Sequence, residues 1–352
     1  MIHPLWGPTM SRQINQNHLT KRFHVGAVSS FTLETIKRVD RLTEDGRCNL
    51  IEAWPEQPGG LAYYAIRAIR SFDPKAHLGI AGLVGAVDRS HVLDAVRSLE
   101  AETRFLLPVS GKRTNKSEVI LGPDDRKIIV RCSQAIGFEG DLNPRRYQQI
   151  ENVIARSQSC LLGNLPAELT ARLISHAREM ETYTVLGAGG QQFGHLADLP
   201  ANALMLNQQE ARQATGMIGE NAGEETVFNA VVQLSPVDHV VIMTGGDRHP
   251  IYVADRLSGQ RWKLPPKHLK GDNGFLNTLG AGDMMAGTIA FLLGQKQLGL
   301  RGDAVREAVG FARDVVTTHL TQLATDRAKL RARYREIRDQ YLLEPAMPVL
   351  VG

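Results

Sequence analysis

Apolar runs alternate along the chain with longer segments in which apolar residues recur every three or four positions. Such runs predict strands, and the longer spacing predicts helices with one buried face. The predicted strands are residues 22–30, 77–85, 118–122, 127–132, 159–164, 182–187, 202–207 and 238–246. The predicted helices are residues 60–71, 90–100, 144–156, 166–180, 208–215 and 224–234. Short, almost wholly apolar strands suit a parallel sheet that helices cover on both faces.

The order of these elements predicts an α/β fold. Strands and helices alternate between residues 150 and 300, as in βαβ units with right-handed crossovers. Residues 101–135 break this rhythm, because two strand patterns flank the turn Gly122-Pro123-Asp124-Asp125, which indicates a hairpin. We therefore expect a doubly wound core that carries a small β-rich excursion.

Composition narrows the class of protein. The chain has 352 residues, 43% of them apolar and 22% charged, a balance that excludes a disordered or fibrous protein. Lys and Arg exceed Asp and Glu by 41 to 37, which is too small an excess to indicate a nucleic-acid partner. The longest nearly apolar run, Met284–Leu293, falls short of the roughly 20 residues of a membrane span. We expect a soluble protein without a membrane partner.

The N-terminal segment and the cysteines indicate a compartment. Residues 1–21 are polar and lack the apolar stretch of a secretory signal, so we expect a disordered leader, with Met10 as an alternative start, and a cytoplasmic protein. Cys48, Cys132 and Cys160 are isolated from one another, which favours free thiols over a disulfide or zinc site.

The C-terminal part predicts a long basic helix. Residues 303–342 contain no Pro and one Gly, and residues 327–338 contain six Arg or Lys. One helical stripe holds Leu330, Tyr334, Ile337 and Tyr341. We treat residues 326–352 as a basic helix and tail. Packing of the stripe on its own domain is the favoured interpretation, followed by a homodimer contact and then by nucleic-acid or membrane binding.

The segment with the strongest chemical signal begins at Asn277 and reads NTLGAGDMMAG. Gly280 and Gly282 leave backbone N–H groups open where a loop turns into a helix, and such a helix start attracts anions. Asp283 follows in the first turn, beside an anion hole formed by Gly280, Ala281 and Gly282. Phosphoryl transfer needs both a base for the attacking hydroxyl and donors for the transferred charge. Taken alone, the segment also fits a glycine-rich turn that caps a core helix.

With the residues that follow it, NTLGAGDMMAGTIAFLL resembles the C-terminal signature D-T-x-G-A-G-D-x-F-x-G of the PfkB (ribokinase-like) carbohydrate kinase family. Further matches stand in the family's order over residues 22–300. They are the diglycine Gly59-Gly60, the N-x-x-E motif from Asn207 to Glu210 and the T-x-G turn from Thr244 to Gly246. Alone, the N-x-x-E motif also fits a helix cap, and the T-x-G motif a strand-end turn. The predicted hairpin stands where the family inserts its lid.

The resemblance implies a ribokinase-like three-layer α/β/α core with a mostly parallel sheet, formed by residues 22–325, and a small β lid from segments near residues 27–58 and 101–135. It implies a kinase that uses ATP and Mg²⁺ to phosphorylate a hydroxyl, typically primary, of a sugar, sugar derivative or nucleoside. The implied catalytic residue is Asp283, with the anion hole at Gly280, Ala281 and Gly282. The implied ligand-binding residues are Asn207, Glu210, Thr244 and Gly246 for the nucleotide, Glu210 for the metal through water, and Gly59, Gly60 and Tyr64 for the acceptor. A non-catalytic ligand-binding relative is the alternative, and the retained Asp283 argues against it.

The substrate positions depart from the family pattern. Tyr64 stands where the family has an Asn four residues after the diglycine, and residues 27–31 hold no acid where many members carry an Asp. With Tyr64 and Phe31 in these places, we predict an acceptor that is flatter and less hydroxylated than ribose or fructose. Asn277 replaces the first Asp of the signature, so a monovalent-cation site that uses this position would lose a charge.

A second glycine-rich stretch, residues 187–194, contains G-x-G after a predicted strand. A dinucleotide site is the least favoured interpretation, because Gln192 stands where the third Gly is needed and Leu199-Pro200 interrupts the helix that should follow. The stretch is either a loop that lines the kinase cleft or a plain connection. The histidines form no HxxxH or HExxH pattern, so a metal hydrolase is not indicated.

Overall fold

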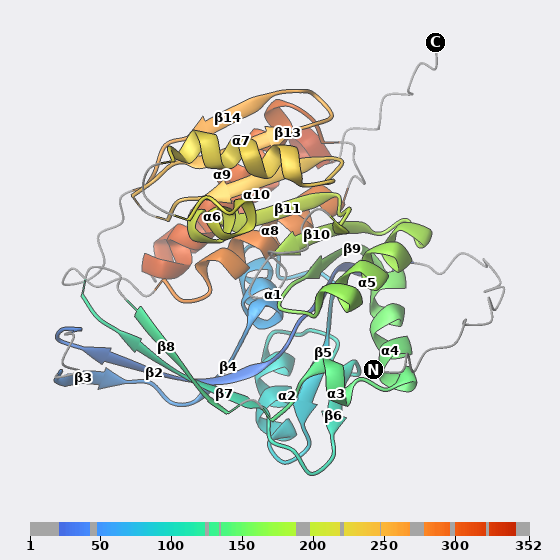
Figure 1. Cartoon of the computed structure of the whole chain (residues 1–352), viewed down its shortest axis with the longest axis vertical. Helices are drawn as coiled ribbons and strands as arrows, with labels where there is room; N and C mark the ends of the chain where they lie inside the picture. The colour runs from blue at the N-terminus through green and yellow to red at the C-terminus, as the bar shows by residue number, and fades with distance from the viewer. Residues whose placement is uncertain are drawn as a thin grey trace.

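The computed structural model describes residues 21–42, 48–123, 127–133, 135–187, 198–218, 222–246, 248–267, 278–295, 300–321 and 324–342. In these residues the core is a nine-stranded sheet with the strand order β14-β13-β12-β11-β10-β9-β1-β5-β6 (Figure 1). All neighbouring strands are parallel except in the pairs β12–β13 and β13–β14. The strands are β1 (Phe23–Val28), β5 (Leu78–Gly85), β6 (Leu106–Val109), β9 (Ser157–Leu162), β10 (Tyr183–Gly187), β11 (Ala203–Asn207), β12 (Val240–Thr244), β13 (Ile251–Asp255) and β14 (Arg261–Leu264).

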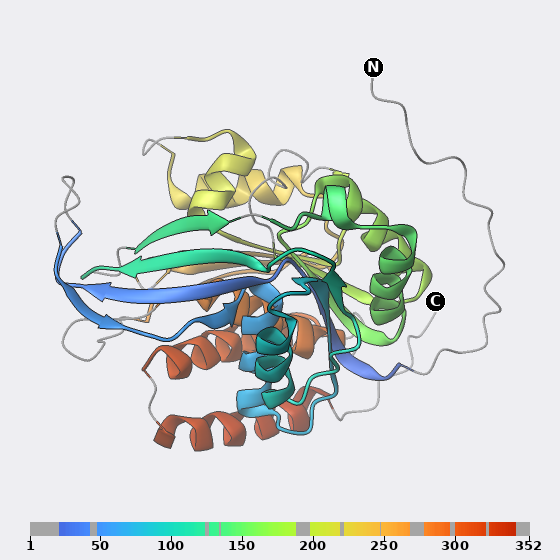
Figure 2. The same cartoon turned by 90° about the horizontal axis from the view of Figure 1, so that it is seen from below.

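Helices cover both faces of this sheet (Figure 2). Two separate apolar clusters fill the spaces between helices and sheet. One layer holds α1 (Leu61–Phe72), α2 (Arg89–Ser98), α8 (Ala281–Gly294), α9 (Asp303–Thr321) and α10 (Ala324–Ile337). The other layer holds α3 (Phe138–Asp141), α4 (Pro144–Ala155), α5 (Ala167–Glu179), α6 (Gln208–Thr215) and α7 (Glu224–Leu234). A mostly parallel sheet between two helical layers confirms the predicted fold class.

A second, smaller sheet forms a lid that extends outward from the core (Figure 2). Its strands are β2 (Thr32–Val39), β3 (Leu50–Ala53), β4 (Gln57–Gly59), β7 (Asn115–Leu121) and β8 (Lys127–Ser133). β7 and β8 pair antiparallel, which confirms the predicted hairpin, although residues 124–126 of its turn lie outside the described part of the chain. β2 pairs parallel with β7 and so joins the two lid segments that the sequence predicted.

Close packing of α1 against α8 brings two helix starts together. A Cβ atom at Gly287 would lie 2.5 Å from the Cβ of Ala65, so the absence of a side chain lets the two helices approach closely. α1 begins after Gly60, and α8 begins after Gly280. The diglycine and the GAGD segment, more than 200 residues apart in sequence, therefore lie beside each other.

The C-terminal residues pack on their own domain, as the favoured interpretation of their apolar stripe predicts. The chain forms two helices, α9 and α10, followed by a π-helical turn at Arg338–Leu342. Leu330, Tyr334 and Ile337 are buried, and the Tyr334 ring centroid lies 5.1 Å from that of Phe72. In the part of the chain that the structure describes, no helix combines the length and the apolar character that crossing a bilayer requires.

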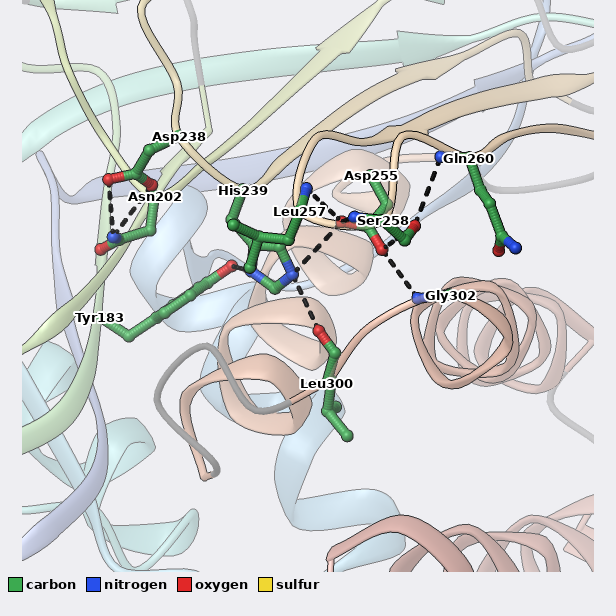
Figure 3. Close-up of polar contacts among 10 residues, drawn as sticks. All are labelled: Tyr183, Asn202, Asp238, His239, Asp255, Leu257, Ser258, Gln260, Leu300 and Gly302. Atoms are coloured by element: carbon green, nitrogen blue, oxygen red, sulfur yellow. Dashed lines mark hydrogen bonds and ion pairs between the residues drawn. The ribbon is translucent and has the colours of Figure 1, made fainter. Parts of the chain in front are cut away.

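A buried polar network ties β12 to the segment before α9 (Figure 3). The Tyr183 hydroxyl lies 2.7 Å from Nδ1 of His239, and Nε2 of His239 lies 3.0 Å from the carbonyl oxygen of Leu300. A carbonyl oxygen can only accept, so Nε2 carries the proton and the Tyr183 hydroxyl donates to Nδ1. Asp255 lies 3.8 Å from Nε2 and accepts a hydrogen bond from the N–H of Gly302 at 2.7 Å.

Replacing His239 by Phe is expected to lower the free energy of unfolding by about 2–3 kcal/mol, because the Tyr183 hydroxyl and the Leu300 carbonyl lose a buried partner. Burial lowers the pKa of His239 more than the charge of Asp255 raises it, so the folded protein favours the neutral ring. Below the ordinary pKa of about 6.5, the unfolded chain binds a proton at His239 that the folded protein does not bind. The stability that is present above this pH is therefore lost as the pH falls.

Urea unfolding of both proteins at about pH 7.5 and about pH 5.5 measures this effect. His239→Phe should lose less stability between the two pH values than the unsubstituted protein. Equal losses in the two proteins would show that His239 does not contribute to the acid sensitivity.

Candidate active site

A cavity of about 660 Å³ lies between the core and the lid. Its walls come from residues at the ends of β10, β11 and β12, from the first turns of α1 and α8, and from the lid strands β2, β7 and β8. It includes Ser30, just after β1, and the strand order reverses at β1, which lies between β5 and β9 in the sheet. Ligands of open α/β sheets bind at such a switch point, so this cavity is the candidate active site.

Most of the residues that the sequence predicts for the site line this one cavity. They are Gly60, Tyr64, Asn207, Glu210, Thr244, Gly280, Ala281, Gly282 and Asp283. Gly59 and Gly246 do not line the cavity. Gly59 is adjacent to Gly60, which does, and Gly246 lies two residues after Thr244, which also does. Segments from four distant parts of the sequence therefore meet at one place.

The start of α8, where the sequence predicts an anion hole, leaves backbone N–H groups without a partner in the helix. Gly280 precedes the helix with a φ of 71°, a left-handed conformation that glycine adopts without strain. The N–H of Ala281 donates to the carbonyl of Thr278 at 3.3 Å, and the N–H of Met284 donates to the carbonyl of Gly280 at 2.8 Å. The N–H groups of the first helical turn between them have no carbonyl partner within the helix. Gly282 is therefore a better placed donor than Ala281.

Asp283 is the third residue of α8, and its carboxylate faces the cavity. Burial raises the pKa of Asp283 to about 7, and the negative charges of Glu34 and Glu210 add to this shift. Lys127 from the lid opposes it. A carboxylate with a pKa near neutrality is a stronger base than an ordinary carboxylate, and about half of it is ionised near pH 7. Both properties suit a general base.

Asn207 and Glu210 form a capping box at the start of α6. The Asn207 side chain accepts from the N–H of Glu210 at 2.9 Å, and the Glu210 carboxylate accepts from the N–H of Asn207 at 2.7 Å. The cap that the sequence left open as an alternative is therefore present, and both residues also line the cavity. Burial raises the pKa of Glu210 to about 7.

The donor set for a metal is sparse. No group of three or more His, Cys, Asp or Glu side chains in the described residues is arranged to hold a metal ion. A single carboxylate such as Glu210, facing a cavity large enough for a nucleotide, fits Mg²⁺ that keeps several waters and binds mainly to phosphate oxygens.

Thr244 ends β12 at the cavity wall, and its hydroxyl donates to the carbonyl of Leu206 at 3.4 Å. The turn that follows is tight, because a Cβ at Gly245 would overlap His249. Gly246 is exposed beside this turn. The T-x-G motif thus forms both the strand-end turn and part of the cleft wall.

Sequence reasoning missed an acid beside Tyr64 in the cavity. Glu34 on β2 lines the cavity, and its Oε2 accepts a hydrogen bond from the Tyr64 hydroxyl at 2.6 Å. Phe31, which we expected to shape the pocket, is 1% exposed in the core and does not line the cavity. Residues 27–31 hold no acid, but Glu34 three positions later places a carboxylate in the cavity, and the expectation that Phe31 shapes the pocket is wrong. The sequence signal for this acid was Glu34 itself, which stands two positions after the polar Thr32 and so shares a strand face with it.

The lid also supplies two cations that the sequence did not single out. Lys127 and Arg131 lie on β8 with Ile129 between them, and all three line the cavity, as alternate residues of a strand share one face. The charge of Lys127 acts on the three carboxylates Glu34, Glu210 and Asp283. The cavity therefore holds these three carboxylates together with two cations from the lid strand β8.

No protein-family model matches the chain, and no curated protein matches it in sequence. Solved structures match it in fold. Ribokinase from Giardia lamblia superimposes with a TM-score of 0.70 at 18% identity, over 91% of this chain and 99% of that one. The chain has the ribokinase-like fold. Phosphofructokinase-2 from Escherichia coli in complex with fructose-6-phosphate gives a TM-score of 0.65 at 15% identity, over 88% and 98%. Arabidopsis thaliana ribokinase complexed with ribose and ATP gives 0.66 at 15%, over 87% and 98%.

These likenesses confirm the ribokinase-like fold that the sequence motifs predicted, and at 15–18% identity they establish the fold alone. Some sequence predictions fall outside the described residues: the leader up to residue 20, Asn277, the glycine-rich stretch from residue 188 onward, and the tail from residue 343. Gly187, at the end of β10, lines the cavity, so this stretch begins at the wall of the cleft.

Proposed function

We propose that this chain is an ATP-dependent kinase of the PfkB family that phosphorylates a hydroxyl, primary in the favoured case, of a sugar, sugar derivative or nucleoside. One observation carries the proposal. Asp283, with a pKa raised to about 7, shares a cavity with the open N–H groups of the first turn of α8, in a ribokinase-like fold. A base and an anion hole at one point are the two parts that phosphoryl transfer to an alcohol requires.

The residues have distinct roles in this reaction. The acceptor hydroxyl lies against Asp283, which takes its proton as the hydroxyl oxygen forms a bond to the γ-phosphorus of ATP. The bond from that phosphorus to the bridging oxygen breaks, and ADP leaves with the electron pair. The N–H of Gly282 and its neighbours at the start of α8 stabilise the negative charge on the transferred group.

The nucleotide side of the proposal rests on Asn207, Glu210, Thr244 and Gly246, which surround the ends of β11 and β12. Mg²⁺, when bound with ATP, would neutralise phosphate charge, and Glu210 is the carboxylate that would hold it through water. The structure of Arabidopsis thaliana ribokinase with ribose and ATP supports ATP as the phosphoryl donor of this fold.

Release of ADP, measured with and without acceptor, tests the proposed function. We expect release to rise at least about tenfold when an accepted alcohol from a panel of sugars, sugar derivatives and nucleosides is added, a change of about 1.4 kcal/mol in the barrier. Because Tyr64 fills space in the acceptor half of the cavity, ribose and fructose should give kcat/KM below about 10⁴ M⁻¹s⁻¹.

The alternative of a non-catalytic binder makes the opposite prediction for this assay. A binder would be stabilised against heat by ATP or by an acceptor, yet release no ADP in response to any alcohol. Stabilisation by a ligand in thermal melting, without ADP release in response to any alcohol, would therefore identify a binder.

A further inference from the structure

The Glu34 carboxylate is held in one position at the acceptor end of the cavity. It accepts hydrogen bonds from the Tyr64 hydroxyl at 2.6 Å, from the Thr32 hydroxyl at 3.2 Å and from the backbone N–H of Gly60. A Cβ atom at Gly59 would overlap this carboxylate, so the diglycine makes room for it. Glu34 is 7% exposed, and it is one of the residues that line the cavity.

Tyr64 fills the space between Glu34 and the anion hole. The ring is 3% exposed, and a Cβ atom at Gly280 would lie 2.5 Å from its Cγ. Its hydroxyl is committed to Glu34, and burial raises its pKa far above the ordinary value, so it acts as a neutral donor. One ring therefore connects the diglycine, the lid strand β2 and the turn before α8.

The Glu34 carboxylate can accept one more hydrogen bond than the protein supplies to it. An ionised carboxylate offers about four acceptor sites. Three are used by Tyr64, Thr32 and Gly60, so one remains. Buried polar groups are normally satisfied, and because Glu34 lines the cavity, a bound ligand can supply this hydrogen bond.

Burial raises the pKa of Glu34, whereas the hydrogen bonds from Tyr64, Thr32 and Gly60 and the charge of Lys127 on β8 lower it. Asp283 on α8 and Glu210 on α6 make the same cavity more negative. The other charged side chains that line the cavity are Lys116, Arg131 and Glu139, and Lys116 is paired with Glu56. An acceptor with a hydrogen-bond donor satisfies Glu34, whereas an apolar group there leaves the carboxylate desolvated without a partner.

We propose that Glu34 and Tyr64 form an acceptor subsite in which the Glu34 carboxylate receives a hydrogen bond from a second donor group of the acceptor, a hydroxyl or an ammonium next to the reacting hydroxyl. Tyr64 holds that carboxylate in place and limits the depth of the subsite below Gly280. This inference rests on the proposed kinase function, since it names the group that selects the acceptor. It assigns an acceptor that carries such a donor, for example an amino sugar or the ribose of a nucleoside, while the space that Tyr64 fills still disfavours free ribose and fructose.

Thermal-shift titration in the presence of a non-hydrolysable ATP analogue tests the subsite with ribose, fructose, glucosamine and adenosine as probes. Glu34→Gln is expected to weaken binding of the best probe by about 10- to 100-fold, the usual size of a hydrogen bond to a charged group, and to leave binding of the ATP analogue unchanged. Tyr64→Phe keeps the ring and should weaken the same probe by a smaller factor. Glu118→Gln is the matched control, because this lid glutamate pairs with Lys37 at 2.9 Å and does not line the cavity.

A second readout separates a positioning role from a structural one. The charge of Glu34 contributes to the raised pKa of Asp283, so Glu34→Gln should move the acid limb of the kcat/KM profile to lower pH. The inference is overturned if Glu34→Gln and Tyr64→Phe both bind the best probe within threefold of the unsubstituted protein, or if no probe binds while the ATP analogue does. Failure of the ATP analogue to bind would overturn the proposed function instead, and Glu34-dependent probe binding would still support the subsite.

Discussion

Replacing Asp283 by Asn is expected to lower kcat by about 10²- to 10⁴-fold, the range that positioned proton transfer contributes. An alcohol is a poor nucleophile near neutral pH, and Asn cannot accept its proton. The substitution keeps the size of the side chain at the third position of α8, where Gly280 is the N-cap. It also removes a negative charge from a cavity that already holds Glu34 and Glu210, so binding of ATP should be unchanged or tighter.

The alternative role of Asp283, a cap for a core helix, predicts a different result. Asn is itself a good cap, so the variant would stay active and lose about 1 kcal/mol of stability or less. Asp303→Asn is the matched control: Asp303 also stands in the first turn of a helix, α9, and does not line the cavity. Steady-state turnover and melting temperature are measured on the same preparations. An Asp283→Asn protein that keeps more than about a tenth of the rate would exclude Asp283 as the base.

The core of the fold was predictable because its strands and helices have strong local patterns. The helices predicted at residues 60–71, 144–156 and 224–234 form within two residues of the expected ends. Pro144 at the start of α4 and the Asn143 side chain, which accepts from the N–H of Arg146 at 2.9 Å, explain one such boundary. Buried parallel strands such as β11 and β12 are continuous apolar runs, which few other elements imitate.

Most of the strands that the sequence analysis missed lie at sheet edges or in the lid; the exception is β13, which is buried between β12 and β14. β14 has exposed Arg261 and Lys263 on either side of Trp262, so it lacks an apolar run. β3 is exposed along its whole length. Strands of this kind are held by backbone hydrogen bonds to one neighbour, which leave no strong hydrophobic pattern in the sequence.

The same reason explains which part of the site was missed. Asp283 and Asn207 stand in recognisable motifs at helix starts, whereas Glu34 and Lys127 reach the cavity from lid strands that carry no motif. Their proximity to Asp283 depends on how the lid sheet sits over the core, which is a tertiary property. Tyr64 was noticed only as a departure from the family pattern, and its partner Glu34 became identifiable through the 2.6 Å hydrogen bond.

Replacing Gly280 by Ala is expected to combine a loss of stability with a loss of turnover of about 10²- to 10³-fold, the usual effect of removing one donor from an anion hole. The φ of 71° at Gly280 costs an alanine about 1–2 kcal/mol. In addition, the new Cβ would lie 2.5 Å from the Tyr64 ring, so either the ring or the turn must move. Movement of the turn displaces the N–H groups that face the transferred phosphoryl group.

Gly111→Ala separates the two causes. Gly111 has the same φ of 71°, but a Cβ there would meet nothing within 4 Å, and the residue does not line the cavity. Its alanine variant should therefore show the backbone strain alone, with turnover unchanged. Urea unfolding and kcat of the two variants are compared with those of the unsubstituted protein. If Gly280→Ala loses no more stability than Gly111→Ala and keeps its turnover, the contact with Tyr64 is easily relieved and the turn before α8 does not position the anion hole.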